Sequence, residues 1–171
     1  MTRQLPLAAL AVTLLGLAGC GSSSPQTQAA AFIAEHQQQA VRVQQGAVAA
    51  DAALARLSSP PTAGQLRALA RTAQQGHDLI ARAHDEWVSA QGGAEETLSS
   101  AEIEADDGAN EIRDALAGLV VYAGRAGRPD AGTLARYEAQ MKSGREKWDE
   151  GISQIWHLGS RPDPPTVQRS A

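Results

Sequence analysis

The chain has 171 residues, a net charge of −4, and a composition that is 43% hydrophobic but only 4% aromatic. It carries no basic stripe and few aromatic side chains on which bases could stack, so we expect no nucleic-acid partner. Alanine and glutamine are abundant while β-branched and aromatic residues are scarce, which favours helix over strand, and the single cysteine allows no disulfide within the chain.

Residues 1–19 have the layout of a secretory signal peptide. Arg3 gives a short positively charged start, an apolar run follows from Leu5, and small residues then precede Cys20. The apolar run is too short to span a bilayer stably. We therefore expect this segment to direct export and then to be removed.

The end of this segment reads Leu17-Ala18-Gly19-Cys20. A leucine, two small residues and a cysteine, directly after an apolar run, resemble the lipobox of bacterial lipoproteins. The resemblance covers only residues 1–20. It implies a diacylglycerol on the thiol of Cys20, cleavage just before it, and an extracytoplasmic protein held on the bacterial cell membrane by two or three acyl chains. The alternatives are an ordinary signal peptide with an incidental cysteine, or a buried free thiol.

Two polar segments flank the remaining sequence. Residues 20–28, the lipidated cysteine followed by "GSSSPQTQ", have no periodicity and predict a flexible tether. Residues 159–171 contain three prolines and no apolar periodicity, which predicts a disordered tail. Residues 29–158 are therefore expected to form the folded domain.

The first half of this domain contains two helical patterns. One runs from about Ala29 to Leu57 and ends at "SSPP", because proline cannot continue a helix. The next begins with a capping box at Thr62 and Gln65 and ends at "QGG", residues 91–93. Spacings of three and four predict these core positions: Ile33, His36, Ala40, Val43, Ala47, Ala50, Leu54 and Leu57, then Leu66, Leu69, Ala73, His77 or Gly76, Ile80, His84 and Trp87.

The second half of the domain contains two more helical patterns. One starts at Glu95, or at a second capping box formed by Ser99 and Glu102, and "GRAGRPD" ends it. The last opens near Pro129 and ends at Gly159. Their predicted core positions are Leu98, Ala101, Ala105, Ala109, Ile112, Leu116, Leu119 and Ala123, then Leu134, Tyr137, Met141, Gly144, Trp148, Ile152 and Ile155.

Four helices of similar length joined by short turns predict an all-α fold, an up-down-up-down four-helix bundle. The alternative is an elongated pair of coiled-coil hairpins that completes its core by dimerising.

The bundle topology places most histidines and all the tryptophans at the pole nearest the tether. This candidate pole contains Phe32, Ile33, His36, His84, Trp87, Leu98, Trp156 and His157, with Trp148 two turns further in. Three interpretations compete: an aromatic core plug, a belt at the membrane interface, and a pocket for an apolar ligand or a metal. The candidate ligand or interface residues are His36, His84, Trp87, Trp156 and His157.

The sequence offers no metal site by spacing. His77 and His84 lie one heptad apart, which is too far to share one ion, and no Glu-x-x-His pair of the di-iron bundles occurs. We expect no cofactor beyond the covalent lipid on Cys20.

An acidic run lies between Ala83 and Ile112, a stretch with nine acids and no lysine or arginine. Glu104, Asp107, Glu111 and Asp114 fall on one helical face, where a cation or basic partner could dock. The favoured interpretation is a solvated face near a helix start.

No catalytic motif of a known class occurs in the chain, so we expect no enzyme. The resulting hypothesis is a membrane-anchored lipoprotein that acts as a binding or scaffolding module of the cell envelope, with an envelope protein as partner. The alternative is a carrier or sensor for a small apolar ligand or metal, using the candidate pole.

Overall fold

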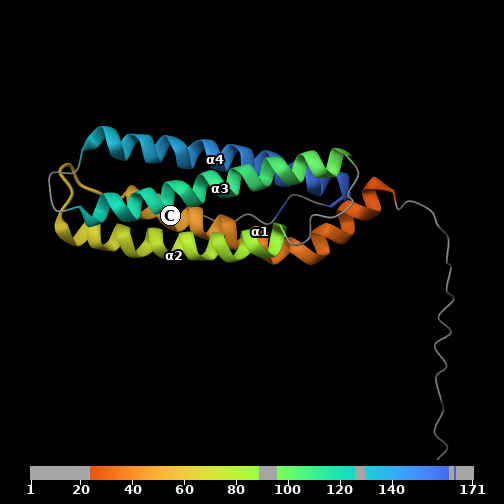
Figure 1. The fold of residues 1–171 in the computed structure, drawn as a ribbon, viewed down its shortest axis with the longest axis horizontal. Coiled ribbons are helices and arrows are strands. Elements are labelled where there is room, and N and C mark those ends of the chain that lie inside the picture. Colours follow the sequence, from red (N-terminus) through yellow and green to blue (C-terminus); the bar gives the residue numbers. More distant parts are fainter. Residues whose placement is uncertain (1–23, 89–95, 126–129, 162–163, 165–171) are drawn as a thin grey trace, which may run out of the picture.

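The computed structural model describes residues 24–88, 96–125, 130–161 and 164, without the side chains of residues 87, 88, 96 and 97. These residues form four α-helices: α1 (Pro25–Leu54), α2 (Ala63–Val88), α3 (Glu96–Gly124) and α4 (Ala131–Leu158). No strand occurs among them. The predicted all-α fold with four helices is confirmed (Figure 1). None of the described helices is long and apolar enough to cross a membrane.

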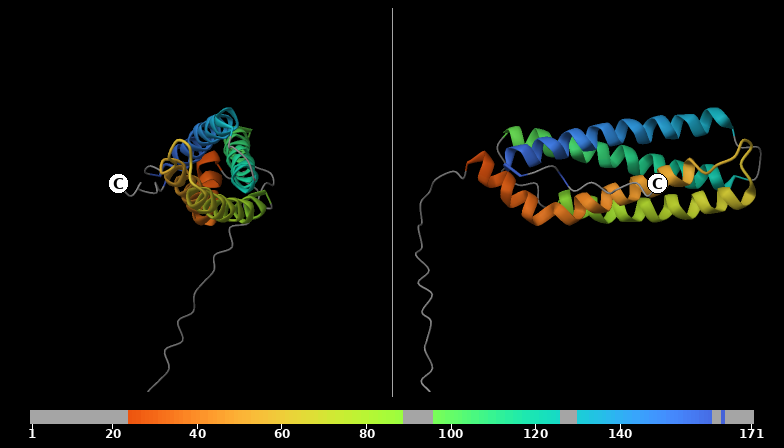
Figure 2. Two further views of the ribbon diagram at one scale, coloured as in Figure 1. Left: turned by 90° about the vertical axis from the view of Figure 1, so that its left-hand side faces the viewer. Right: turned by 180° about the vertical axis from the view of Figure 1, so that it is seen from behind.

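Helices that follow one another in the chain run antiparallel. Between α3 and α4, Gly118 lies against the ring of Tyr137 at one end, whereas Gly151 lies against the backbone of Ala105 nearer the other. Between α1 and α2, Gly46 packs on Gly76. The two hairpins pack on each other to form one elongated bundle, seen along and across its axis in Figure 2.

α1 also runs antiparallel to α4, which closes the bundle. Near the start of α1, Gln26 donates from Nε2 to Ser160 Oγ at 2.8 Å, just beyond the end of α4. Toward the end of α1, Asp51 pairs with Arg145. One pole of the bundle therefore contains the start of α1 and the end of α4.

The core follows the apolar stripes predicted from the sequence. Burial removes these side chains from water, and it is the main favourable contribution to folding in a chain without a disulfide. The residues that are essentially inaccessible include Val43, Leu69, Ile80, Leu98, Ile112, Leu116, Leu119, Met141, Ile152 and Ile155. The predicted stripes are confirmed at these positions.

Glycines bring α3 and α4 into backbone contact. A β-carbon on Gly108 would lie 2.6 Å from the carbonyl oxygen of Gly144, and one on Gly151 would lie 2.7 Å from that of Ala101. Real β-carbons do not approach this closely, so these positions accept only glycine without a shift of the helices. Gly144 was predicted to lie in the core, whereas no role was predicted for Gly108 or Gly151.

α1 begins at Pro25, before the predicted start at Ala29, so the helix takes in residues assigned to the tether. Ser24 adopts an extended conformation and its hydroxyl accepts from the amide of Thr27 at 3.3 Å. Pro25 then occupies the first helical turn, where its missing N–H costs nothing. The helix ends at Leu54, one turn before the predicted Leu57.

The capping box of α2 is confirmed. The amide of Thr62 donates to Oε1 of Gln65 at 2.8 Å, and the amide of Gln65 donates to Oγ1 of Thr62 at 3.2 Å. α4 is capped by Asp130, which accepts from the amides of Gly132 and Thr133.

α3 begins at Glu96, not at the second box of Ser99 and Glu102. Glu102 instead lies in the interior, 4% exposed. The predicted signal peptide, the lipobox with Cys20, and all of the predicted tail except residues 159–161 and 164 lie outside the described residues.

Candidate functional site

A histidine–aspartate pair joins α2 to α3 in the middle of the bundle. Nε2 of His84 lies 3.2 Å from Oδ1 of Asp106, and these side chains are 19% and 21% exposed. Oδ2 of Asp106 accepts a hydrogen bond from the side-chain Nδ2 of Asn110 at 3.1 Å, one turn further along α3. This hydrogen bond restrains the carboxylate, while Oδ1 lies at ion-pair distance from the imidazole and forms no hydrogen bond to a described group.

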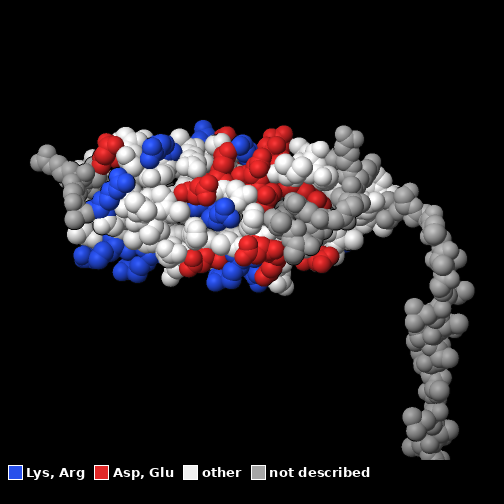
Figure 3. All heavy atoms as spheres, viewed as in Figure 1, with Lys and Arg blue, Asp and Glu red and all other residues white. Residues whose placement is uncertain are grey.

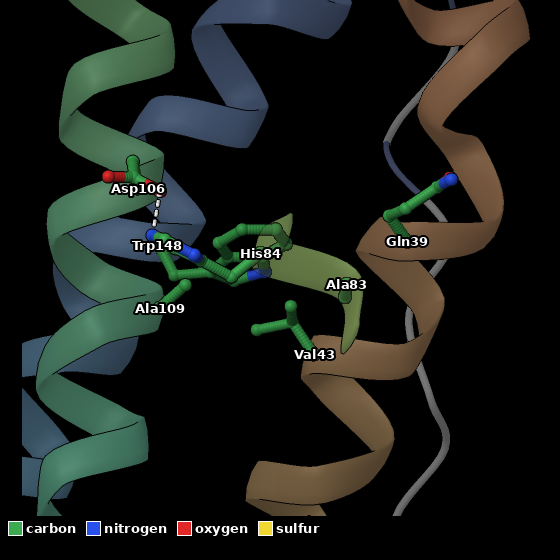
Figure 4. Close-up of a pocket in the computed structure, with 7 residues that line it drawn as sticks. All are labelled: Gln39, Val43, Ala83, His84, Asp106, Ala109 and Trp148. Carbon is green, nitrogen blue, oxygen red and sulfur yellow. Dashed lines mark ion pairs between the residues drawn. The ribbon is translucent and has the colours of Figure 1, made fainter. Parts of the chain in front are cut away.

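A small pocket lies beside this pair. Its volume is about 10 Å³, and it is lined by Gln39, Val43, Ala83, His84, Asp106, Ala109 and Trp148. Figure 4 shows His84 reaching from α2 toward Asp106, with Trp148 beside it. Nδ1 of His84 is buried and makes no hydrogen bond to a described group. The space is about the size of one water molecule, and the surface that lines it is mostly apolar.

Gln39 belongs to a second polar group, between α1 and α2. Its Nε2 donates to Oε2 of Glu86 at 2.7 Å, and Nη1 of Arg42 lies 3.1 Å from both oxygens of that carboxylate. In Figure 4 the amide of Gln39 points away from the pocket that its stem lines. Glu86 therefore joins two turns of α1 to the end of α2.

The other members of the candidate pole have different surroundings. His36 is 4% exposed, and the centre of its ring lies 4.5 Å from the centre of the Phe32 ring. This burial lowers the pKa of the imidazole. Trp156 is buried in the core. His157 is exposed, and its Nδ1–H donates to the carbonyl of Ser153 in its own helix at 2.7 Å. The side chain of Trp87 lies outside the described residues.

The structure therefore brings His84 together with Trp148 and leaves His157 on the surface. Within the part of the chain that the structure describes, no three histidine, cysteine or acidic side chains form a group that could hold a metal ion. The residue that sequence reasoning missed is Asp106, which was assigned to the acidic run. Its place beside Ala105 and Ala109 of the predicted stripe was the available signal.

The acidic run is only partly a solvated face. Asp107 and Asp114 are exposed, as that interpretation requires. Glu102 is buried, and this burial raises the pKa of its carboxyl. Glu111 bonds to Lys147 on α4, and this hydrogen bond lowers the pKa of Glu111. The run thus supplies ion pairs between helices as well as surface charge.

No family model matches the chain, and no significant match was found among curated proteins or solved structures.

Proposed function

We propose that this chain is a lipoprotein of the bacterial cell envelope, anchored outside the cytoplasmic membrane through Cys20, whose helical bundle acts as a binding or scaffolding module. The observation that carries the proposal is the sequence Leu17-Ala18-Gly19-Cys20, which resembles a lipobox and ends four residues before Ser24, the residue that caps α1. Four extended residues reach at most about 14 Å. A lipid on Cys20 would therefore hold the pole at the start of α1 close to the membrane.

The packing of the bundle supports a role for its outer faces. Small-molecule sites in proteins usually have volumes of about 300–1,000 Å³. The pocket beside His84 and Trp148 has about 10 Å³. At this level of the bundle the interior is filled by side chains, which leaves the helix faces available for a partner protein.

The anchor is tested by the Cys20→Ser substitution, with Ser23→Ala as the matched control outside the lipobox. Both proteins are expressed in a bacterial host fed a radiolabelled fatty acid, and membranes are separated from soluble fractions. We expect the original protein and Ser23→Ala to carry label and to sediment with membranes. Cys20→Ser should carry no label. Label retained in Cys20→Ser, or unlabelled soluble original protein, would overturn the anchor.

The scaffolding role needs its own test. Crosslinking in intact cells followed by pull-down from membranes should recover the same envelope protein repeatedly. Substitutions on an exposed helix face should abolish that crosslink while leaving the fold intact by circular dichroism. A chain that crosslinks to no protein above background would contradict this role without bearing on the anchor.

A carrier of a small ligand or a metal is the second candidate. It is favoured by His84, which lines a pocket together with Trp148 and whose buried Nδ1 forms no hydrogen bond to a described group and lies 3.8 Å from Oδ1 of Asp85. Tryptophan fluorescence titrated with Zn²⁺ or an apolar dye discriminates the two. A carrier shows saturable quenching that His84→Ala removes, whereas a scaffold shows none.

A further inference from the structure

Exposed arginines gather at the end of the bundle opposite the start of α1. They come from all four helix ends that meet there, namely the end of α1, the first turns of α2, the end of α3 and the start of α4. We call them the arginine pole: Arg56, Arg67, Arg71, Arg125 and Arg136. In Figure 3 basic side chains are more frequent toward the left-hand end of the bundle, whereas acidic ones dominate its middle.

The arginine pole differs in its pairing from three basic residues elsewhere in the bundle. Lys147 bonds to Glu111, Arg145 to Asp51 and Arg42 to Glu86, so these cations are neutralised by neighbouring helices. None of the five arginines of the pole forms an ion pair with a carboxylate of the described residues. Their guanidinium groups are available to an anion from outside.

Two carboxylates near this pole are engaged by other groups, although Asp130 also interacts electrostatically with Arg136. Asp130 is turned toward its own helix, because it accepts from the amides of Gly132 and Thr133. Asp51 is taken by Arg145. Arg136 donates from Nη2 to the hydroxyl of Tyr137 at 3.3 Å and lies 5.1 Å from the centre of that ring, so one of its donors is used while its charge stays intact.

The donors at this pole and their spacing are compatible with an acidic helix. Helix starts bind phosphate through free backbone amides, but α2 and α4 are capped at this pole by Thr62 and Asp130. The remaining donors are guanidinium forks, which bind both carboxylates and phosphates through two parallel hydrogen bonds. Arg67 and Arg71 lie one turn apart on α2, about 6 Å, which is the spacing of carboxylates one turn apart on an acidic helix.

We propose that the arginine pole is a docking surface for an acidic segment of a partner protein. Only the orientation of this pole rests on the proposed function. If Cys20 is anchored next to the start of α1, a helix of 30 residues places the arginine pole about 45 Å away, facing outward from the membrane. An anchored protein would then offer its positive end to a partner and keep its acidic side chains nearer the lipid.

The test uses the purified protein in detergent micelles and a fluorescent oligo-glutamate peptide as probe. Fluorescence anisotropy should show saturable binding at low salt that weakens as ionic strength rises. The double variant Arg67→Gln/Arg71→Gln should raise Kd roughly three- to tenfold. Arg82→Gln, an exposed arginine further along α2, is the matched control and should leave Kd unchanged.

Two further probes decide the chemistry of the partner. Polyphosphate and phosphatidylglycerol vesicles, matched to the peptide in charge, should bind more weakly and should respond less to the double variant. Stronger binding of either probe, an equal effect of Arg82→Gln, or no peptide binding at low salt would overturn the proposal. Because the assay reads binding in solution, a failure of lipid anchoring would not change its result.

Discussion

Nε2 of His84 lies 3.2 Å from Oδ1 of Asp106, and this contact joins α2 to α3 where the four helices meet around a water-sized pocket. Each side chain is about one-fifth exposed. The pair is therefore less screened than a surface ion pair but not isolated from water. It also restrains how α2 and α3 can slide along each other.

The first prediction concerns the strength of this pair. A double-mutant cycle with His84→Ala and Asp106→Ala should give a coupling free energy of about 1 kcal/mol, since the side chains are in direct contact. Asp106→Ala alone should lower the free energy of unfolding by about 1–2 kcal/mol. Urea unfolding followed by circular dichroism measures both values. The neighbouring Asp107 is exposed, and Asp107→Ala should show no coupling with His84→Ala.

The second prediction concerns the contact between α3 and α4. Gly108→Ala places a methyl group against the backbone of α4, so the helices must separate. Overpacking of this kind should lower the free energy of unfolding by about 1–3 kcal/mol. Gly124→Ala is the control, because no atom of the described residues lies within 4 Å of its β-carbon position, and it should be neutral or stabilising. Equal effects of the two substitutions in thermal unfolding would contradict the backbone contact.

The fold was accessible from the sequence because spacings of three and four residues report burial directly. Ile33, Leu69, Ile112 and Ile152 occupy the core as predicted. The start of α1 was missed because Ser24 and Pro25, which are good helix-start residues, follow a glycine–serine run that resembles a linker. A serine such as Ser24 can cap a helix or belong to a flexible linker, and the neighbouring sequence does not distinguish these two roles.

The site was less accessible, because its contacts cross between helices. His84 and Asp106 belong to different helices, and their registration depends on the length and path of the segment that connects α2 to α3. The spacing of residues within one helix therefore cannot predict that His84 and Asp106 meet. Glu102 was misread for a related reason: its position three residues after Ser99 fits a capping box, while its neighbour Ala101 belongs to the core stripe. The helix begins earlier, and Glu102 then lies in the interior.

The third prediction follows from the burial of Glu102. Burial raises the pKa of this carboxyl above the ordinary value of 4.5. At a pH between the pKa of the unfolded state and that of the folded state, the folded state therefore binds more protons than the unfolded state. Stability then falls as pH rises through this window. Glu102→Gln keeps the shape and removes the charge. Urea unfolding should show the variant becoming more stable relative to the original protein as pH rises through the window, with the difference constant above the folded pKa. A constant difference across this range would exclude the effect.

The fourth prediction has the opposite sign. The hydrogen bond from Lys147 lowers the pKa of Glu111 below 4.5, so this carboxylate stabilises the folded state above its ordinary pKa and loses that contribution as pH falls through the folded value. Glu111→Gln should therefore be less stable than the original protein at neutral pH, and the difference should shrink in acid.

The matched control for Glu111 is Asp114, an exposed acid one turn further along α3. Asp114→Asn should lower the free energy of unfolding less at neutral pH, because among the described residues its carboxylate pairs with Arg113 alone, on its own helix, at 3.8 Å. Urea unfolding across the acid range measures all three proteins. If Glu111→Gln and Asp114→Asn lose the same stability at neutral pH, the bond between Glu111 and Lys147 does not hold α3 to α4. If only Glu111→Gln loses stability, and the loss disappears in acid, the bond joins the two helices as the structure places it.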